Sequence, residues 1–234
     1  MKPRLAARAA AEFLGTLFLL AAVVGSGIMA ERLSGGNAAL ALLANTIATG
    51  AALVALILAA GPVSGAHLNP AVTLAEAWRG RMPWREAPAY LAAQFTGAFA
   101  GVAVAHAMFG LSVFSFSTKI RAGLPQAFSE FVATFGLIAV IRGCARSRPS
   151  AIPIAVGAYI TAAYWFTAST SFANPAVTLA RACTNTFAGI RPADAPAFLA
   201  AQIAGAFIAT LLMNALETQT EAGFASAPAL QNED

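Results

Sequence analysis

Charged residues are scarce in this sequence, and their scarcity excludes a soluble globular domain. Only 10% of the 234 residues are Asp, Glu, Lys or Arg, whereas 59% are hydrophobic. Soluble domains carry about 25% charged residues, because they must cover their surface with groups that water solvates. The chain therefore requires a lipid bilayer as part of its solvent, and we expect a multi-pass membrane protein.

Cysteine and histidine are also rare, with two residues of each. Two cysteines make no disulfide framework, and no Cys or His spacing is typical of a metal site. The net charge of +4 comes from basic residues spread between apolar runs, which argues against nucleic acid as a partner. The sequence also has no nucleophile–base set and no phosphate-binding loop. We therefore expect no enzyme, no cofactor and no bound metal.

Long apolar runs predict where the chain crosses the membrane. One helical crossing needs about 20 residues, and six segments fit: about 9–30, 38–60, 87–108, 125–143, 150–168 and 195–216. The runs 33–75 and 149–180 each hold one crossing and a surplus of about half a crossing. Each surplus contains the heptapeptide NPAVTLA, at 69–75 and 174–180. We expect two half-length helices that enter the membrane and return, which is tolerated only where they line protein or water.

The chain consists of two similar halves. The stretch APAYLAAQFTGAF at 87–99 matches APAFLAAQIAGAF at 195–207, in addition to the repeated heptapeptide. Each half, about 9–109 and 125–216, holds three crossings and one half-helix. Because three is odd, the second half enters the membrane from the opposite face. This predicts an inverted repeat whose two half-helices meet tip to tip near the midplane.

The distribution of basic residues predicts the orientation. Nine of them fall on the side of the N-terminus and five on the other side. The positive-inside rule then places both termini in the cytoplasm. We expect a single channel domain, 1–234, in the inner (plasma) membrane, with a polar cytoplasmic tail at 217–234.

The tips of the half-helices carry the chemistry. Their residues are Asn69, Pro70 and Ala71 in the first copy and Asn174, Pro175 and Ala176 in the second. Asn is a favoured N-cap and Pro suits the first helical turn. Two helix N-termini, each with a charge of about +0.5, would face each other, and the asparagine amides would donate hydrogen bonds. Such a pore passes neutral hydroxylated solutes and resists cations and protons.

This pattern resembles the major intrinsic proteins, the aquaporins and aquaglyceroporins. Two NPA boxes in an inverted repeat carry the resemblance over nearly the whole chain, together with SGAHLNPAVT at 64–73 and a glutamate in the first and fourth crossings. The resemblance implies an all-α membrane fold of the aquaporin type: a six-transmembrane inverted repeat with two re-entrant half-helices. It also implies a homotetramer with one pore per subunit.

The family pattern assigns structural roles to several polar residues. It implies that Glu12 and Glu130 brace the re-entrant loops through backbone groups, and that His67 has a structural role beside the first box. We expect Gln94 and Gln202 to make polar contacts between helices.

The sequence departs from the family at the selectivity filter. Most members have Arg directly after the second NPA, whereas this chain has Val177. Arg181 lies about 6 Å further along the helix axis. It could partly compensate, but we expect its side chain to lie outside the filter plane. The filter is then wide and lacks arginine.

The resemblance also implies the other filter positions. Thr49 and Ser171 fall on two of them. The remaining position, in the fifth crossing, falls on Tyr164, or else on Ala162 or Ala163.

A wide filter suits neutral polyols and metalloid hydroxides. The Val-for-Arg change resembles a bacterial branch associated with arsenic resistance, which implies passive exit of arsenite and of methylated arsenicals, beside glycerol and water. One alternative is a general glycerol, urea and water channel without an arsenic role. A second is an inverted-repeat secondary transporter coupled at Glu12 and Glu130, and a third is a purely structural membrane protein.

Overall fold

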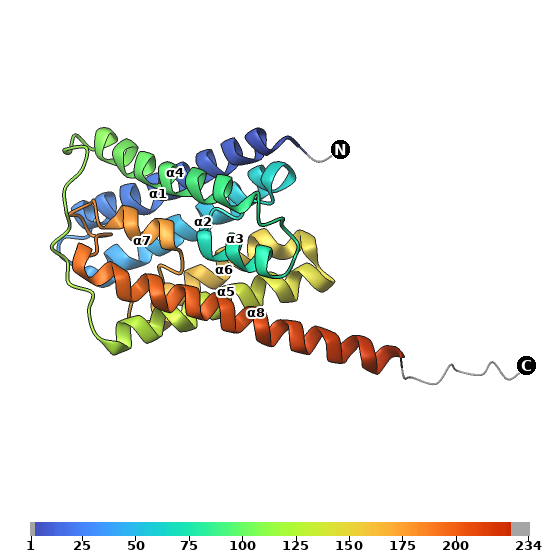
Figure 1. The fold of residues 1–234 in the computed structure, drawn as a ribbon. Coiled ribbons are helices and arrows are strands. Elements are labelled where there is room, and N and C mark those ends of the chain that lie inside the picture. Colours follow the sequence, from blue (N-terminus) through green and yellow to red (C-terminus); the bar gives the residue numbers. More distant parts are fainter. Residues whose placement is uncertain (1–2, 226–234) are drawn as a thin grey trace, which may run out of the picture.

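A computed structural model describes residues 3–225, and within that range every regular element is a helix (Figure 1). The long helices are α1 (Leu5–Leu33), α2 (Ala38–Ser64), α4 (Ala87–Met108), α5 (Leu124–Ser147) and α8 (Ala195–Ala225). The shorter ones are α3 (Pro70–Trp78), α6 (Ile152–Phe166) and α7 (Pro175–Arg181), with the 3-10 turns η1 (Pro149–Ala151) and η2 (Pro192–Asp194). The expected all-α membrane fold class is confirmed.

One of the six expected crossings is shorter than predicted. Five helices of the described chain are long and apolar enough to cross a membrane. The segment expected at 150–168 forms the 3-10 turn η1 followed directly by α6, so that helical structure runs over 149–166. The α-helical part, α6, has 15 residues, fewer than the roughly 20 of a full crossing. It ends at Phe166 because residues 167–173 must leave the helix to return toward the start of α7.

The polar tail expected from residue 217 begins as a helix. The last helix, α8, continues through Ala225, because ETQTEA contains good helix formers. Glu217 also forms an ion pair with Arg142 of α5, which fastens this part of α8 to the bundle. The remainder of the expected tail, 226–234, lies outside the described residues.

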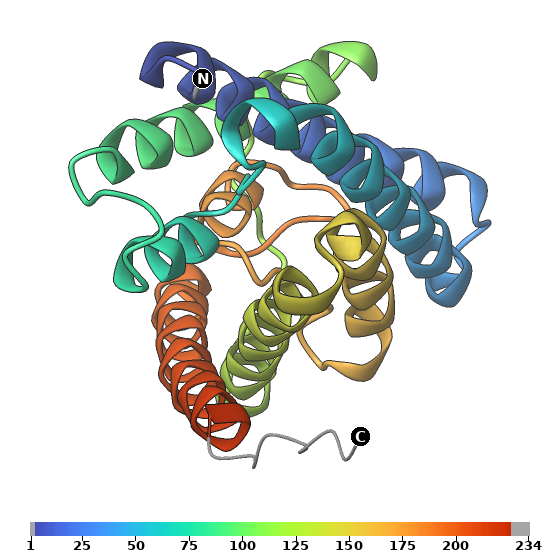
Figure 2. The ribbon, with the colours of Figure 1, turned by 90° about the vertical axis from the view of Figure 1, so that its right-hand side faces the viewer.

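The two halves pack in the same way. In the first half, α1 packs against α2 and α4, and in the second, α5 packs against α6 and α8. The halves meet along α2 and α6. Seen end-on, the longer helices surround the short helix α7 (Figure 2). We call the side where α1 begins and α8 ends the near end, at the right of Figure 1, and the opposite side the far end.

Two glycines at matching positions allow close contacts between helices. A Cβ added to Gly97 of α4 would meet the carbonyl oxygen of Phe13, and one added to Gly205 of α8 would meet that of Phe131, closer than real Cβ atoms approach. Neighbouring backbone cannot give way cheaply, so both positions require glycine. Since Phe13 and Phe131 directly follow Glu12 and Glu130, these contacts set where the two glutamates lie.

Candidate pore

The half-helices α3 and α7 begin with the same asparagine cap. Oδ1 of Asn69 accepts a hydrogen bond from the backbone N–H of Ala71 at 2.9 Å, and Oδ1 of Asn174 accepts one from Ala176 at 3.0 Å. Pro70 and Pro175 follow at the first helical position. The repeated NPA sequence therefore builds two equivalent helix starts, because each asparagine satisfies an otherwise unpaired N–H of the first turn.

The same asparagines also join the two halves. Nδ2 of Asn69 donates to the carbonyl oxygen of Ala173 at 2.8 Å, and Nδ2 of Asn174 donates to that of Leu68 at 2.8 Å. The structure thus brings the two tips together, each bound to the loop of the opposite half. An amide nitrogen carries two hydrogens, so each asparagine keeps one N–H for a further acceptor.

The loops that lead to the tips follow matching backbone paths. Residues with positive φ occupy the fourth, third and first positions before each asparagine: Gly65, Ala66 and Leu68, and Thr170, Ser171 and Ala173. A positive φ is unfavourable for a residue other than glycine, and it persists only where the surrounding structure holds the backbone in place.

Glu12 supplies part of that restraint to the first loop. It has no exposed surface. Its carboxylate accepts hydrogen bonds from the backbone N–H of His67 at 2.9 Å and of Leu68 at 2.6 Å. It also accepts from the Ser64 hydroxyl and from the Gln94 amide, each at 2.7 Å. These contacts tie α1 and α4 to the loop before α3.

Glu130 holds the second loop in the same manner and is equally buried. Its carboxylate accepts from the backbone N–H of Phe172 and of Ala173, both at 2.8 Å, and from Gln202 at 2.6 Å. Gln202 also donates to Thr178 of α7 at 2.8 Å.

Gln94 and His67 complete the restraint around α3. Gln94 donates to the Thr73 hydroxyl at 2.8 Å, in addition to Glu12. His67 places Nδ1 3.0 Å from the same hydroxyl, and its ring lies 5.2 Å from that of Tyr90. The imidazole therefore packs beside the half-helix and also lines the central cavity.

A cavity of about 280 Å³ is lined by both asparagines and by all four expected filter residues, Thr49, Tyr164, Ser171 and Val177. The Tyr164 hydroxyl lies 3.4 Å from that of Thr49. Of the three positions considered in α6, Tyr164 is the one that lines this cavity.

Most of the remaining wall is apolar and was not singled out from the sequence. These lining residues are Leu19, Val23, Leu53, Ile57, Leu137, Ile141, Val156 and Ile160. They recur four residues apart along α1, α2, α5 and α6, which is the spacing of one helix face. Apolar residues that face lipid have the same type and spacing, so the sequence does not distinguish them from these wall residues.

Arg181 also lines the cavity, near the far end. Its Nε donates to the carbonyl oxygen of Ala188 at 2.5 Å, and its guanidinium lies 3.4 Å from the centre of the Phe172 ring. Side chains of a helix lean toward its N-terminus, and this guanidinium interacts electrostatically with Tyr164, one of the expected filter residues. The absence of arginine at position 177 therefore does not leave the cavity without a guanidinium.

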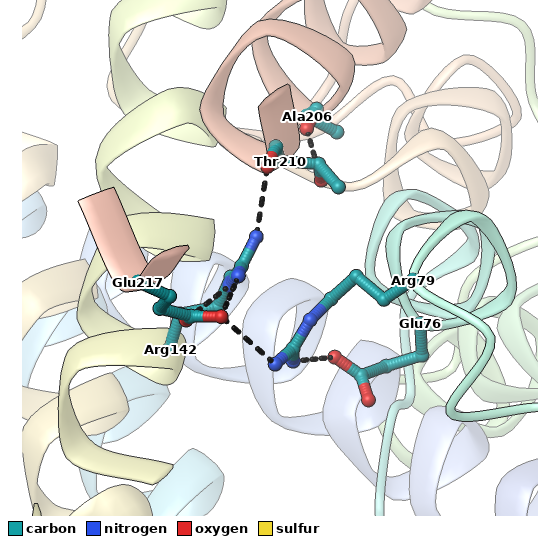
Figure 3. Close-up of polar contacts among 6 residues, drawn as sticks. All are labelled: Glu76, Arg79, Arg142, Ala206, Thr210 and Glu217. Carbon is teal, nitrogen blue, oxygen red and sulfur yellow. Dashed lines mark hydrogen bonds and ion pairs between the residues drawn. The ribbon is translucent and has the colours of Figure 1, made fainter. Parts of the chain in front are cut away.

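The near end of the cavity carries a network of ion pairs (Figure 3). Glu76 and Arg79 line the cavity there and pair with each other at 2.8 Å. Arg142 pairs with Glu217 at 2.5 Å and donates to the carbonyl oxygen of Thr210 at 2.8 Å. Glu217 also approaches Arg79 at 3.9 Å. The network connects α3, α5 and α8, and it balances each acidic group at this mouth with an arginine.

Comparison with known proteins gives consistent matches. The family model described as "Major intrinsic protein" matches residues 2–171 and 145–233. The chain is 58% identical over 206 residues to "Aquaglyceroporin AqpS" of Rhizobium meliloti (strain 1021), covering 88% of both chains. It is 38% identical over 176 residues to "Aquaporin NIP1-3" of Oryza sativa subsp. japonica, covering 72% of this chain and 60% of that relative.

Among solved structures, the aquaglyceroporin from Plasmodium falciparum has a similar fold. It matches with a TM-score of 0.67, over 89% of this chain and 95% of that chain, at 21% identity.

Proposed function

The chain belongs to the major intrinsic protein family, and from this premise we propose that it is a passive channel for arsenite and glycerol. Its aquaglyceroporin relatives and membrane-length helices support an integral membrane channel for small neutral solutes. We further propose that it functions as a homotetramer in the plasma membrane, with the near end, and so both termini, in the cytoplasm.

The observation that carries this proposal is the meeting of the two asparagine tips on the wall of one cavity. Asn69 and Asn174 are fixed by the opposite loops, and each keeps one N–H for a passing solute. Hydroxyl groups of a solute accept such hydrogen bonds as they lose water. The apolar walls offer no comparable replacement to an ion, so hydrated cations and anions pay a larger dehydration cost.

Thr49, Tyr164, Ser171 and Val177 are proposed as the selectivity filter. Their small or medium side chains, together with one tyrosine, leave a cavity of about 280 Å³. Arsenite is a neutral trihydroxide at pH 7 and is similar in shape to glycerol, so the same donors and the same width suit both. Methylated arsenicals have a similar size and fall in the same class.

Glu12 and Glu130 are proposed to brace the loops, with His67 supporting the first box. This proposal also weighs against the secondary transporter, because a coupling carboxylate must be free to bind its ion. The carboxylate of Glu12 accepts four hydrogen bonds and that of Glu130 accepts three. Neither is free to exchange an ion without releasing its loop.

The test is solute flux into proteoliposomes that contain the purified protein. We expect arsenite uptake and glycerol-driven swelling well above those of empty liposomes. Asn174→Ala should reduce both, whereas Asn37→Ala is the matched control. Asn37 is also an N-cap, of α2, but it caps Leu40 at the exposed surface.

Each alternative has its own outcome in this experiment. Glycerol flux without arsenite flux indicates a general aquaglyceroporin. Saturable flux driven by a proton gradient indicates a transporter. No flux of any solute in a folded sample indicates a structural protein.

A further inference from the structure

We propose that Arg181 is the residue that discriminates charge in the far half of the pore, so that the channel takes neutral or oxygen-rich solutes there and rejects cations. This inference rests on the proposed channel function. It concerns a residue outside the four filter positions, one turn beyond the position where relatives of the family carry arginine.

The two half-helices differ first at this residue. The heptapeptide NPAVTLA is followed by Glu76 in α3 and by Arg181 in α7, each seven positions after its asparagine. Both side chains line the same cavity, one toward each end. The inverted repeat thus places opposite charges at equivalent positions on the two sides of the asparagine tips.

The two charges differ in whether an opposite charge pairs with them. Glu76 is neutralised by Arg79 at 2.8 Å. Among the described side chains, those of residues 3–217, no carboxylate forms an ion pair with Arg181. The far half of the cavity therefore keeps a net positive charge, whereas the charge at Glu76 is compensated.

Arg181 is held rigidly in this position. It is only 2% exposed, Nε is bound to the Ala188 carbonyl oxygen, and the guanidinium plane packs on the Phe172 ring. The side chain lines the cavity and lies close enough to Tyr164 to interact with it electrostatically. A guanidinium fixed in this way is pre-organised, because little side-chain entropy is lost when a solute oxygen binds.

Val177 complements this arrangement. Its short side chain leaves room beside the guanidinium, where an arginine at position 177 would itself fill the space. A solute can then pass with its oxygen atoms toward the donors of Arg181. A cation on the same path meets an uncompensated charge in surroundings of low dielectric constant, where repulsion is much stronger than in water.

The experiment compares a neutral solute with a small cation in proteoliposomes. Glycerol swelling reports the open channel, and uptake of labelled guanidinium ion reports cation entry, since this ion stays charged at every working pH. Wild type should conduct glycerol and exclude guanidinium. Arg181→Met should raise the guanidinium-to-glycerol permeability ratio at least about tenfold, the factor expected for one lost charge interaction.

Two further variants are controls. Arg181→Lys keeps the charge and should keep the low ratio of wild type. Arg32→Gln removes the same charge from the exposed far end of α1, outside the cavity, and should leave the ratio unchanged.

The outcomes separate this inference from the channel proposal. Absence of glycerol flux in wild type would overturn both. Normal glycerol flux with an unchanged ratio in folded Arg181→Met would overturn only the role of Arg181. If Arg181→Met does not fold, Arg181→Gln replaces it. Failure of both neutral variants to fold, while Arg181→Lys folds, would show a structural residue and refute the proposal.

Discussion

The two re-entrant loops reach the same backbone path by different means. Both have positive φ at the same three positions before the asparagine, but the first uses Gly65 where the second uses Thr170. Thr170 is β-branched and strained in that region. Arg121 holds it in place: the guanidinium donates to the Ser169 carbonyl oxygen at 3.0 Å and to the Thr170 hydroxyl at 3.3 Å. The backbone geometry is thus shared between the repeats, while the residues that permit it are not.

The first loop is held by hydrogen bonds at Ser64, the residue that precedes Gly65. Tyr90 donates to the carbonyl oxygen of Ser64 at 2.7 Å, and the Ser64 hydroxyl donates to Glu12. The second loop has a buried arginine in place of these hydroxyl contacts. The glutamates are thus the common support of the two loops, and the remaining restraints are specific to each half.

The largest expected effect comes from removing the common support. Glu130→Ala leaves two buried backbone N–H groups without acceptors, each costing about 1–3 kcal/mol. Glu12→Ala does the same in the first loop. We predict loss of at least about 2 kcal/mol of stability and of glycerol flux in both variants, measured by thermal unfolding in detergent and by liposome swelling.

Glu31→Ala is the control for these variants, because Glu31 is exposed at the end of α1. Wild-type stability in Glu12→Ala or Glu130→Ala would show that the loops do not depend on the carboxylates.

The second prediction uses the matching valines of the two half-helices. Val72 and Val177 both lie three residues after an asparagine and line the cavity. Val177→Arg adds a guanidinium beside Arg181 and should lower glycerol flux at least about tenfold, equivalent to about 1.4 kcal/mol of barrier. Val72→Arg should have a smaller effect, because the new charge lies one turn from Glu76 and can pair with it.

Swelling assays on the two variants, with folding checked by circular dichroism, measure this difference. Equal inhibition would mean that the two sides of the pore are equivalent in width and charge. Unchanged glycerol flux in Val177→Arg would remove Val177 from the filter.

The third prediction concerns a substitution that gives the first loop a threonine where the second loop has one. Gly65→Thr places a β-branched residue at φ +90°, where an added Cβ meets only ordinary contacts with the His67 ring. The cost is therefore backbone strain, about 1 kcal/mol or somewhat more, because the first loop has no counterpart of Arg121. Thermal unfolding should show a lower Tm than wild type, whereas Gly61→Thr, in open space on α2, tests the effect of threonine without positive φ. An equal Tm for Gly65→Thr and wild type would contradict the strain argument.

The smallest expected effect concerns Lys119, in the far-end loop beside Arg121. Burial, followed by the charges of Arg121 and Arg181, lowers the pKa of Lys119 to about 8 from 10.5. Between these values the unfolded chain binds the proton that the folded protein has released, so stability rises with pH. We predict a small increase in Tm from about pH 8 to pH 10 that is absent in Lys119→Met. The same slope in both proteins would assign it to another group.

The sequence predicted the fold well where its signals were local and duplicated. The two NPAVTLA copies predicted the half-helices. The odd number of crossings per half predicted that the half-helices enter the membrane from opposite faces. The length of α6 was not predicted, because an apolar run continues through residues that leave the helix. Its wall residues, such as Ile160, could not be distinguished from lipid-facing ones, since both environments are apolar.

Arg181 shows a second limit of sequence reasoning. Spacing along a helix gives the height of a Cα atom, and by that measure Arg181 lies a full turn beyond Val177. The long side chain instead lies close enough to Tyr164 to interact with it electrostatically. Its stacking on Phe172 depends on the return path of residues 167–173, which only the folded structure contains.

The most direct test of the central claim asks whether solutes pass the residue at position 171. Ser171→Cys is introduced after both native cysteines, Cys144 and Cys183, are replaced by serine. The thiol is labelled with a bulky methanethiosulfonate before reconstitution, and Thr118→Cys, in the exposed far-end loop, is labelled as the control. We predict that labelling Ser171→Cys lowers glycerol flux to that of empty liposomes and that labelling the control does not. Complete labelling at position 171 with undiminished flux would contradict a pathway through this cavity.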